Sequence, residues 1–204
     1  MGGTTLTQEE IQRVVDFHGH WCPGLAIGIR AGELALAEFG RAGDEEVVAV
    51  VETDMCGVDA IQVLTGCTFG KGNLLHLDHG KMAFTFYRRR DGKALRFLFD
   101  GDRLGAPSEE MTALQQKRAA AGLTPEDTER LEACRAAWSE RIMAAELADA
   151  FRIQPVAGPA PQRARLMASL VCEACGEKTM ESRTRRFDGR TLCSPCFERL
   201  DRRH

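Results

Sequence analysis

The feature that most constrains this chain is a set of four cysteines near its C-terminus. Cys172 and Cys175 form one CxxC pair, and Cys193 and Cys196 form a second pair after seventeen intervening residues. Two such pairs, joined by a short hairpin, place four thiolates tetrahedrally around one Zn²⁺ ion. A redox dithiol is the weaker interpretation, because two matched pairs are present and no βαβ pattern surrounds them. We therefore predict a structural zinc site in a small C-terminal module.

The charge of this module bears on its partners. Its side chains from residue 168 onward carry a net charge of +2, and a zinc ion with four thiolates adds −2. The whole chain carries −3, so we expect no electrostatic attraction to nucleic acid. A folding or docking role, with a protein as the possible partner, is the favoured interpretation of the module.

Length and composition indicate a globular protein. The chain has 204 residues, of which 44% are hydrophobic and 28% charged, which allows one substantial core and a small appendage. The N-terminal sequence MGGTTLTQEE lacks the basic and apolar regions of a secretory signal. We expect a cytoplasmic protein without a membrane segment, in which the eight cysteines are metal ligands or reactive thiols.

Local signals predict alternating helices and strands up to residue 99. Thr7 and Glu10 fit a capping box for a helix that ends near residue 17. Pro23 suits the first position of a second helix, with Cys22 as its N-cap and Gly40 as its end. Asp54 is expected to cap a third helix. The predicted strands are residues 46–53, 74–77, 81–88 and 94–99, and the predicted third helix is 55–64.

The remaining chain is predicted to be helical up to a linker. One helix is expected over 108–121 and another from Thr124 to about residue 150, followed by a proline-rich extended segment. The resulting domain prediction is a core over residues 1–153, a linker over 154–167 and a zinc-finger module over 168–204.

A second concentration of metal-binding residue types lies near the N-terminus. His18, His20 and Cys22 occur within five residues, beside the bend at Pro23. A second segment carries Cys56, Asp59 and Cys67, and each of these residue types can bind a borderline metal. Because Cys56 and Cys67 flank one predicted helix, we expect that they do not share one ion unless the loop folds back.

The predicted helix starts give these thiols a further property. Cys22 and Cys56 lie at helix N-termini, where a partial positive charge stabilises anions, so we expect both to ionise readily. Gly24, Gly28 and Gly32 give the second helix a flat face, which favours close helix packing.

Lys71 lies in a glycine-rich loop that superficially resembles a phosphate loop. The loop is one residue too short for that motif and follows a helix instead of a strand, so we reject a phosphate-loop interpretation. Lys71 remains a candidate contact for an anionic ligand, with a solvated lysine as the equal alternative.

Three segments together resemble the FmdE family, which takes its name from a component of formylmethanofuran dehydrogenase. They are FHGHWCPGLAIGIRAGELAL (17–36), ETDMCGVDAIQVLTGCTFGKGNL (52–74) and DHGKMAFTFYRR (78–89). The resemblance implies an α+β core with a mixed or antiparallel sheet and flanking helices, a homodimer and an appended zinc finger. It also implies a cleft that binds a small-molecule ligand. The implied cleft residues are His18, His20, Cys22, Cys56, Asp59 and Cys67, with Lys71 nearby.

Three functional hypotheses follow. In the first, His18, His20, Cys22, Cys56 and Cys67 supply a second transition-metal site in an accessory protein or enzyme. Its ligand would be a one-carbon or small carbonyl compound, close to molybdenum- or tungsten-enzyme metabolism, with His18 or Asp59 handling protons. In the second, Cys22 cycles with Cys56 or Cys67 in thiol redox or sulfur chemistry. In the third, the zinc finger makes the chain a regulatory or binding module.

Overall fold

The computed structural model describes residues 3–201 and divides into two compact units, Met1–Arg163 and Ala164–His204. The ends of the two predicted domains, residues 1–2 and 202–204, lie outside the described residues. The first unit is an α+β core, and the second carries the four C-terminal cysteines.

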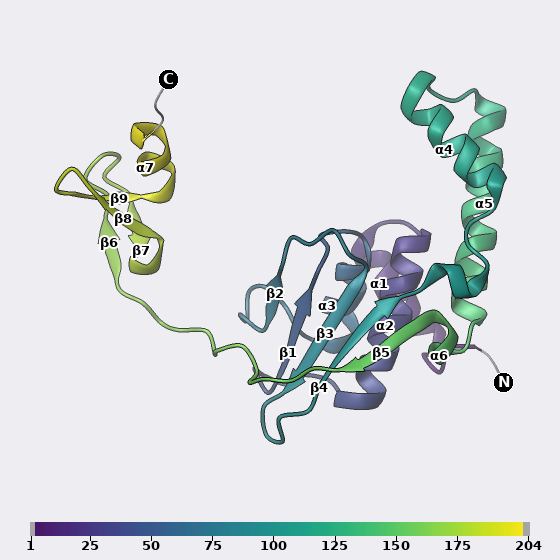
Figure 1. The fold of residues 1–204 in the computed structure, drawn as a ribbon, viewed down its shortest axis with the longest axis horizontal. Coiled ribbons are helices and arrows are strands. Elements are labelled where there is room, and N and C mark those ends of the chain that lie inside the picture. Colours follow the sequence, from purple (N-terminus) through teal and green to yellow (C-terminus); the bar gives the residue numbers. More distant parts are fainter. Residues whose placement is uncertain (1–2, 202–204) are drawn as a thin grey trace. The chain divides into compact units, whose positions relative to one another are not determined.

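A mixed five-stranded sheet forms the centre of the first unit, in the order β2-β1-β3-β4-β5 (Figure 1). β1 and β2 run parallel, and the other neighbouring strands run antiparallel. The α+β class with a mixed sheet is therefore confirmed. The strands are β1 (Val47–Val51), β2 (Leu74–His76), β3 (Ala83–Arg88), β4 (Ala94–Phe99) and β5 (Phe151–Pro155).

Three helices precede or interrupt the first strands, and α2 is the central one. It contacts the other two, the sheet strand β3 and the later helix α5 (Pro125–Ala144). The core around it contains the buried rings of Phe84, Phe86 and Phe97. None of the helices within residues 3–201 combines the length and apolar composition that crossing a bilayer requires. The three helices are α1 (Gln8–His18), α2 (Pro23–Phe39) and α3 (Gly57–Thr65).

Helices α4 (Glu109–Ala121) and α5 form a pair that extends away from the sheet (Figure 1). The predicted start of α5 is confirmed, because Thr124 and Asp127 form a reciprocal capping box. The predicted continuation of this helix to residue 150 is wrong. The backbone turns extended at Ala145, whose carbonyl accepts a hydrogen bond from the buried Arg30 guanidinium.

Two short elements complete the core around this break. They are the 3₁₀ turn η1 (Gly101–Leu104) and the helix α6 (Leu147–Ala150). α6 leads directly into β5, which the sequence did not predict. β5 pairs antiparallel with β4, so that Phe97 lies opposite Ile153.

The prediction that Asp54 caps the third helix is also wrong. α3 begins at Gly57 with Cys56 as its N-cap residue, and Asp54 is exposed. The Thr53 hydroxyl accepts a hydrogen bond from the backbone N–H of Met55 and stabilises a bend before the helix. Cys56 therefore lies one position before the helix, not within its first turn.

The second unit consists of two hairpins and a terminal helix. The hairpin of β6 (Ser169–Val171) and β7 (Lys178–Met180) contains the first cysteine pair in its turn. The hairpin of β8 (Thr184–Phe187) and β9 (Arg190–Cys193) ends at the second pair. The remaining elements are the 3₁₀ turn η2 (Glu181–Arg183) and the helix α7 (Ser194–Asp201).

Candidate functional site

The start of α2 fixes the position of the first thiol. Cys22 has an extended backbone, and its sulfur accepts a hydrogen bond from the Leu25 N–H at 3.4 Å. Pro23 occupies the first helical position, where its missing N–H leaves no helical hydrogen bond unmade. The predicted N-cap role of Cys22 is therefore confirmed, and this cap aims the sulfur at the first turn of the helix.

Close packing of α2 against α3 brings the second thiol to the first. A Cβ on Gly28 would overlap the Gly57 backbone, which leaves no room for a larger residue. A Cβ on Gly24 would lie 3.3 Å from Cys56 Cβ and 3.9 Å from Cys22 Sγ. The glycine face of α2 is thus a helix-packing surface, as predicted, and it places Cys56 beside Cys22.

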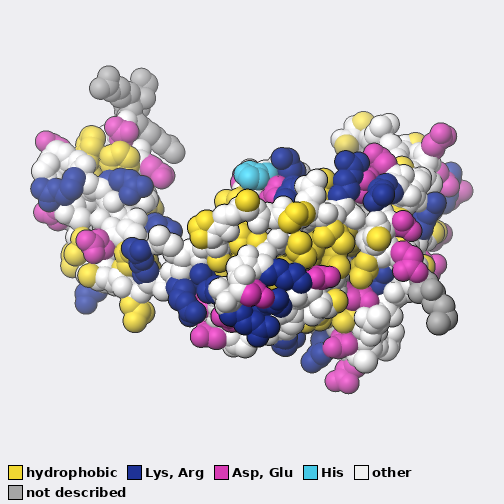
Figure 2. Space-filling model, turned by 60° about the horizontal axis from the view of Figure 1, so that its bottom comes forward, with side chains coloured by type: hydrophobic (Ala, Val, Ile, Leu, Met, Phe, Trp, Pro, Cys, Tyr) yellow, Lys and Arg dark blue, Asp and Glu magenta, His cyan; other side chains and the backbone are white. Residues whose placement is uncertain are grey.

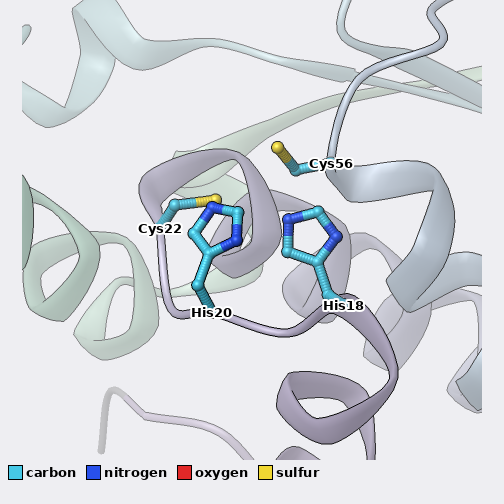
Figure 3. Close-up of side chains that lie close together, drawn as sticks. All are labelled: His18, His20, Cys22 and Cys56. Atoms are coloured by element: carbon cyan, nitrogen blue, oxygen red, sulfur yellow. The ribbon is translucent and has the colours of Figure 1, made fainter.

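His18, His20, Cys22 and Cys56 form one compact cluster, which we call the core cluster (Figure 3). One potential ligand atom from each residue lies within 4.8 Å of the others. His18 is the last residue of α1, and Gly19 follows it at a φ of 89°, which turns the chain back toward α2. The rings of His18 and His20 consequently lie with their centroids 4.5 Å apart. Three segments that are separate in the sequence meet here.

Asp59 orients one of the two imidazoles. His18 Nδ1 lies 2.7 Å from Asp59 Oδ2, and Gln62 donates a weaker hydrogen bond to the other carboxylate oxygen at 3.5 Å. With Nδ1 donating to Asp59, the Nε2 atom of a neutral His18 carries its lone pair. Within residues 3–201 this Nε2 is buried and has no hydrogen-bond partner. A buried nitrogen that is left unpaired is costly, unless it binds something that the protein does not itself supply.

The thiol of Cys56 does not ionise as readily as its place at a helix start suggests. Burial raises its pKa above the ordinary value, and the neighbouring Cys22 side chain raises it further. Cys56 makes no side-chain capping hydrogen bond to α3 that would offset these effects. The expectation of a readily ionised Cys56 is therefore wrong, and this thiol retains its proton until a cation takes its place.

Cys67 and Lys71 lie outside the core cluster. Cys67 is fully buried in the hydrophobic core and donates a hydrogen bond to the Val47 carbonyl at 3.5 Å. Burial raises the pKa of this thiol. A Cβ on Gly66 would lie 3.7 Å from Lys71 Nζ, so the ammonium lies beside the C-terminal end of α3. The cluster is at the opposite end of that helix.

The structure adds residues of α5 that the sequence analysis missed. A hollow of about 360 Å³ adjoins the cluster and is lined by His20, Trp21 and Cys22 on one side. The other side is α5, and the missed lining residues are Glu132, Arg135, Ala136 and Ser139. Their spacing of three and four residues places them on one helix face, which is the signal that could have identified them.

The four C-terminal cysteines form a second cluster in the other unit. One sulfur atom from each of Cys172, Cys175, Cys193 and Cys196 lies within 4.8 Å of the others. The Cys193 N–H donates to Cys172 Sγ at 3.3 Å, and Arg199 Nη2 donates to Cys196 Sγ at 2.9 Å. Hydrogen bonds from backbone N–H groups, that of Cys193 first, lower the pKa of the Cys172 thiol to about 6. Such donors stabilise thiolates, so this donor set fits a structural zinc ion.

Comparisons with known proteins agree with both clusters. Residues 17–152 match the family described as FmdE, molybdenum formylmethanofuran dehydrogenase operon. Residues 164–202 match the prokaryotic dksA/traR C4-type zinc finger. The zinc-finger match and the four-cysteine cluster together support the structural zinc site.

One curated protein is also similar. A protein of Archaeoglobus fulgidus, described as a probable S-adenosyl-L-methionine-binding protein, is 32% identical over 194 residues, which is 90% of this chain. The chain spans about half the length of that relative, 51%.

A crystal structure from Syntrophus aciditrophicus has the same fold, and its protein is described as tungsten formylmethanofuran dehydrogenase FmdE-like. Its TM-score is 0.64 at 24% identity, and the similarity covers all of both chains. Together with the family match, which covers most of the sequence, this fold similarity confirms the resemblance seen in the sequence. The chain belongs to the FmdE family and carries a C4-type zinc finger after its core domain.

Proposed function

We propose that the core cluster binds a second metal ion, in addition to the zinc ion of the C-terminal finger. The ligands are His18, His20, Cys22 and Cys56. Two imidazoles and two thiolates suit Zn²⁺ or another borderline transition metal. Cys67, which is buried away from the cluster, is not among the proposed ligands.

The observation that carries this proposal is the buried, unpartnered Nε2 of His18. Its ring is oriented by Asp59 through Nδ1, which is the arrangement by which a carboxylate fixes a metal-binding imidazole. Three further ligand atoms lie within 4.8 Å of one another and of this histidine. A metal ion would supply the partner that Nε2 lacks.

The proposed role is that of an accessory protein or enzyme for a one-carbon or small carbonyl compound. The description of the family, which refers to a molybdenum formylmethanofuran dehydrogenase operon, supports this substrate class. A bound metal would supply Lewis-acid polarisation of such a ligand. Asp59 holds the imidazole of His18 in one tautomer, and the hollow beside Cys22 provides space for the ligand.

Metal analysis of the purified protein tests the second site. We expect close to two metal equivalents per chain. Replacing Cys22 and Cys56 by serine should remove one equivalent, and replacing the four C-terminal cysteines should remove the other. The matched control is Cys134→Ser on α5, which should retain both equivalents. A wild-type protein that holds one equivalent, which the four C-terminal substitutions abolish, would contradict the proposal.

S-adenosylmethionine is the proposed ligand of the hollow beside the core cluster. The similarity to a probable S-adenosyl-L-methionine-binding protein supports this choice. The hollow has a volume of about 360 Å³, within the range of small-molecule sites. Trp21 lines it and is 38% exposed, and an aromatic face attracts a cationic ligand such as a sulfonium.

A thiol-redox role is the second candidate function. The observation that favours it is the presence of Cys22 and Cys56 in one cluster with their sulfurs close together. Thiol titration before and after mild oxidation tests it. Loss of two free thiols in the wild type, but not in Cys22→Ser, would support this role. An unchanged count would exclude it.

We further propose that the chain is a cytoplasmic homodimer. Hydrophobic side chains gather on one face of the core unit (Figure 2), and Leu77 and Ile153 are among the large exposed ones. Burial of such a face against a second copy is favourable. The zinc finger is the proposed contact for a protein partner, which would give the chain a regulatory or docking role. Sedimentation analysis of the full chain distinguishes a dimer from a monomer.

A further inference from the structure

The hollow beside the core cluster continues along α5. A second hollow of about 450 Å³ adjoins it, because Glu132 and Arg135 line both. The near end of this path contains His20, Trp21 and Cys22, and the far end contains Arg118 of α4. The path therefore joins two cluster residues to a charged surface of the helix pair.

Arg135 is distinctive among the arginines of the core. Its side chain is half-buried, yet it makes no ion pair or hydrogen bond with any other residue within 3–201. By contrast, Arg130 on the same helix forms an ion pair with Glu110 at 2.7 Å, although both side chains are largely exposed. A half-buried guanidinium without a partner has lost part of its hydration without compensation. Arg135 is thus available to an anionic group that enters the hollow.

Glu132 places an opposite charge next to it. Glu132 precedes Arg135 by three residues on α5 and lines the same two hollows. Within the described part of the chain, the two side chains form no ion pair with each other or with a third group. Two adjacent, uncompensated charges of opposite sign complement a ligand that carries both an ammonium group and a carboxylate.

We infer that Arg135 and Glu132 hold the amino-acid part of a small ligand whose other end reaches the core cluster. Arg135 binds the carboxylate through charge-assisted hydrogen bonds, and Glu132 accepts hydrogen bonds from the ammonium group. The opposite wall, which includes Trp21 and Cys22, contacts the remainder of the ligand. This inference rests on the proposed ligand-binding function of the same hollow, and it names the chemical group that decides its specificity.

The test compares two probes that differ in the amino-acid part. S-adenosylmethionine carries it, and 5′-methylthioadenosine does not. Both are titrated calorimetrically into the full-length, metal-loaded protein. We expect the wild type to prefer S-adenosylmethionine by about tenfold or more, since a hydrogen bond between charged groups contributes at least that factor. Arg135→Met should abolish this preference and leave the affinity for methylthioadenosine unchanged within about twofold.

Arg130→Met is the matched control, because it removes an arginine from the same helix but outside the hollow. It should retain the wild-type preference. Glu132→Gln should weaken S-adenosylmethionine binding alone. A preference that survives in Arg135→Met, or a wild type that binds both probes equally or neither, would overturn the inference.

Metal content measured in the same samples separates this inference from the metal proposal. A loss of probe preference in Arg135→Met at unchanged metal content supports the role of Arg135. A single metal equivalent in the wild type would contradict the second metal site, while the probe preference would still judge Arg135 independently.

Discussion

His18 Nδ1 lies 2.7 Å from Asp59 Oδ2, so that a residue at the end of α1 is oriented by a residue in the first turn of α3. This hydrogen bond directs Nε2 of the same ring toward the core cluster, where it is buried without a partner among residues 3–201. The arrangement selects the tautomer that a metal ligand requires.

The first prediction concerns this carboxylate. Asp59→Asn should weaken binding of the core metal roughly 10–100-fold, because the amide no longer holds the imidazole as a carboxylate does. Competition with a chelator of known affinity measures the change. The control is Asp16→Asn, an exposed residue of α1 that accepts a hydrogen bond from Gln12. Equal metal affinity in Asp59→Asn and wild type would contradict the proposed role of Asp59.

The second prediction concerns the contact between α2 and α3. Gly28→Ala should destabilise the core by about 1–3 kcal/mol, because its Cβ would meet the Gly57 backbone and the helices must move apart. The same movement separates Cys22 from Cys56, so the core metal should also bind less tightly. Urea unfolding and metal analysis measure the two effects.

Gly43→Ala is the control for this substitution. Nothing lies within 4 Å of the Cβ that it would add, so stability and metal content should remain near the wild-type values. An equally stable Gly28→Ala protein would show that the helices can adjust, and the packing account of the cluster would then fail.

The third prediction separates the two compact units. Cys172→Ser should remove one zinc equivalent and unfold the C-terminal unit, because a four-cysteine finger depends on its metal for folding. The first unit has its own hydrophobic core, so it should remain folded. Limited proteolysis followed by mass spectrometry measures this, with cleavage expected beyond residue 164. Collapse of the first unit together with the finger would contradict the division.

The fourth prediction concerns acid stability of the α4–α5 pair. Hydrogen bonds from Lys117 and Thr124 lower the pKa of Asp127 from 3.8 to about 2. A carboxylate with a lowered folded-state pKa stabilises the fold above its unfolded pKa, and this contribution is lost as the pH falls. The helix pair should therefore lose protection between about pH 4 and pH 2, as measured by hydrogen exchange.

Asp127→Asn should remove that part of the pH dependence, since the amide does not titrate. The exposed neighbour Glu126→Gln is the control and should retain it. An identical pH profile for Asp127→Asn and wild type would show that another group governs the transition.

Local signals in the sequence were sufficient to predict the helix starts. The capping boxes of Thr7 and Thr124, and the Cys22-Pro23 start of α2, involve residues within one helical turn. Such contacts depend little on the rest of the fold. The zinc-finger cysteines and the core cluster were identifiable because their residue types are concentrated in short segments.

Contacts between distant segments could not be predicted in this way. β5 forms because it pairs with β4, more than fifty residues earlier, and the end of α5 is determined by Arg30. Cys67 appeared equivalent to Cys56 in the sequence, but packing buries it against Val47. The α5 wall of the hollow likewise depends on how α5 packs against α2.

Anomalous scattering from crystals of the full chain, measured on both sides of the metal absorption edge, tests the central claim most directly. The account predicts two peaks per chain. One lies among Cys172, Cys175, Cys193 and Cys196, and the other lies among His18, His20, Cys22 and Cys56 within bonding distance of His18 Nε2. A peak at the four C-terminal cysteines alone, in protein purified without chelator, would contradict the account.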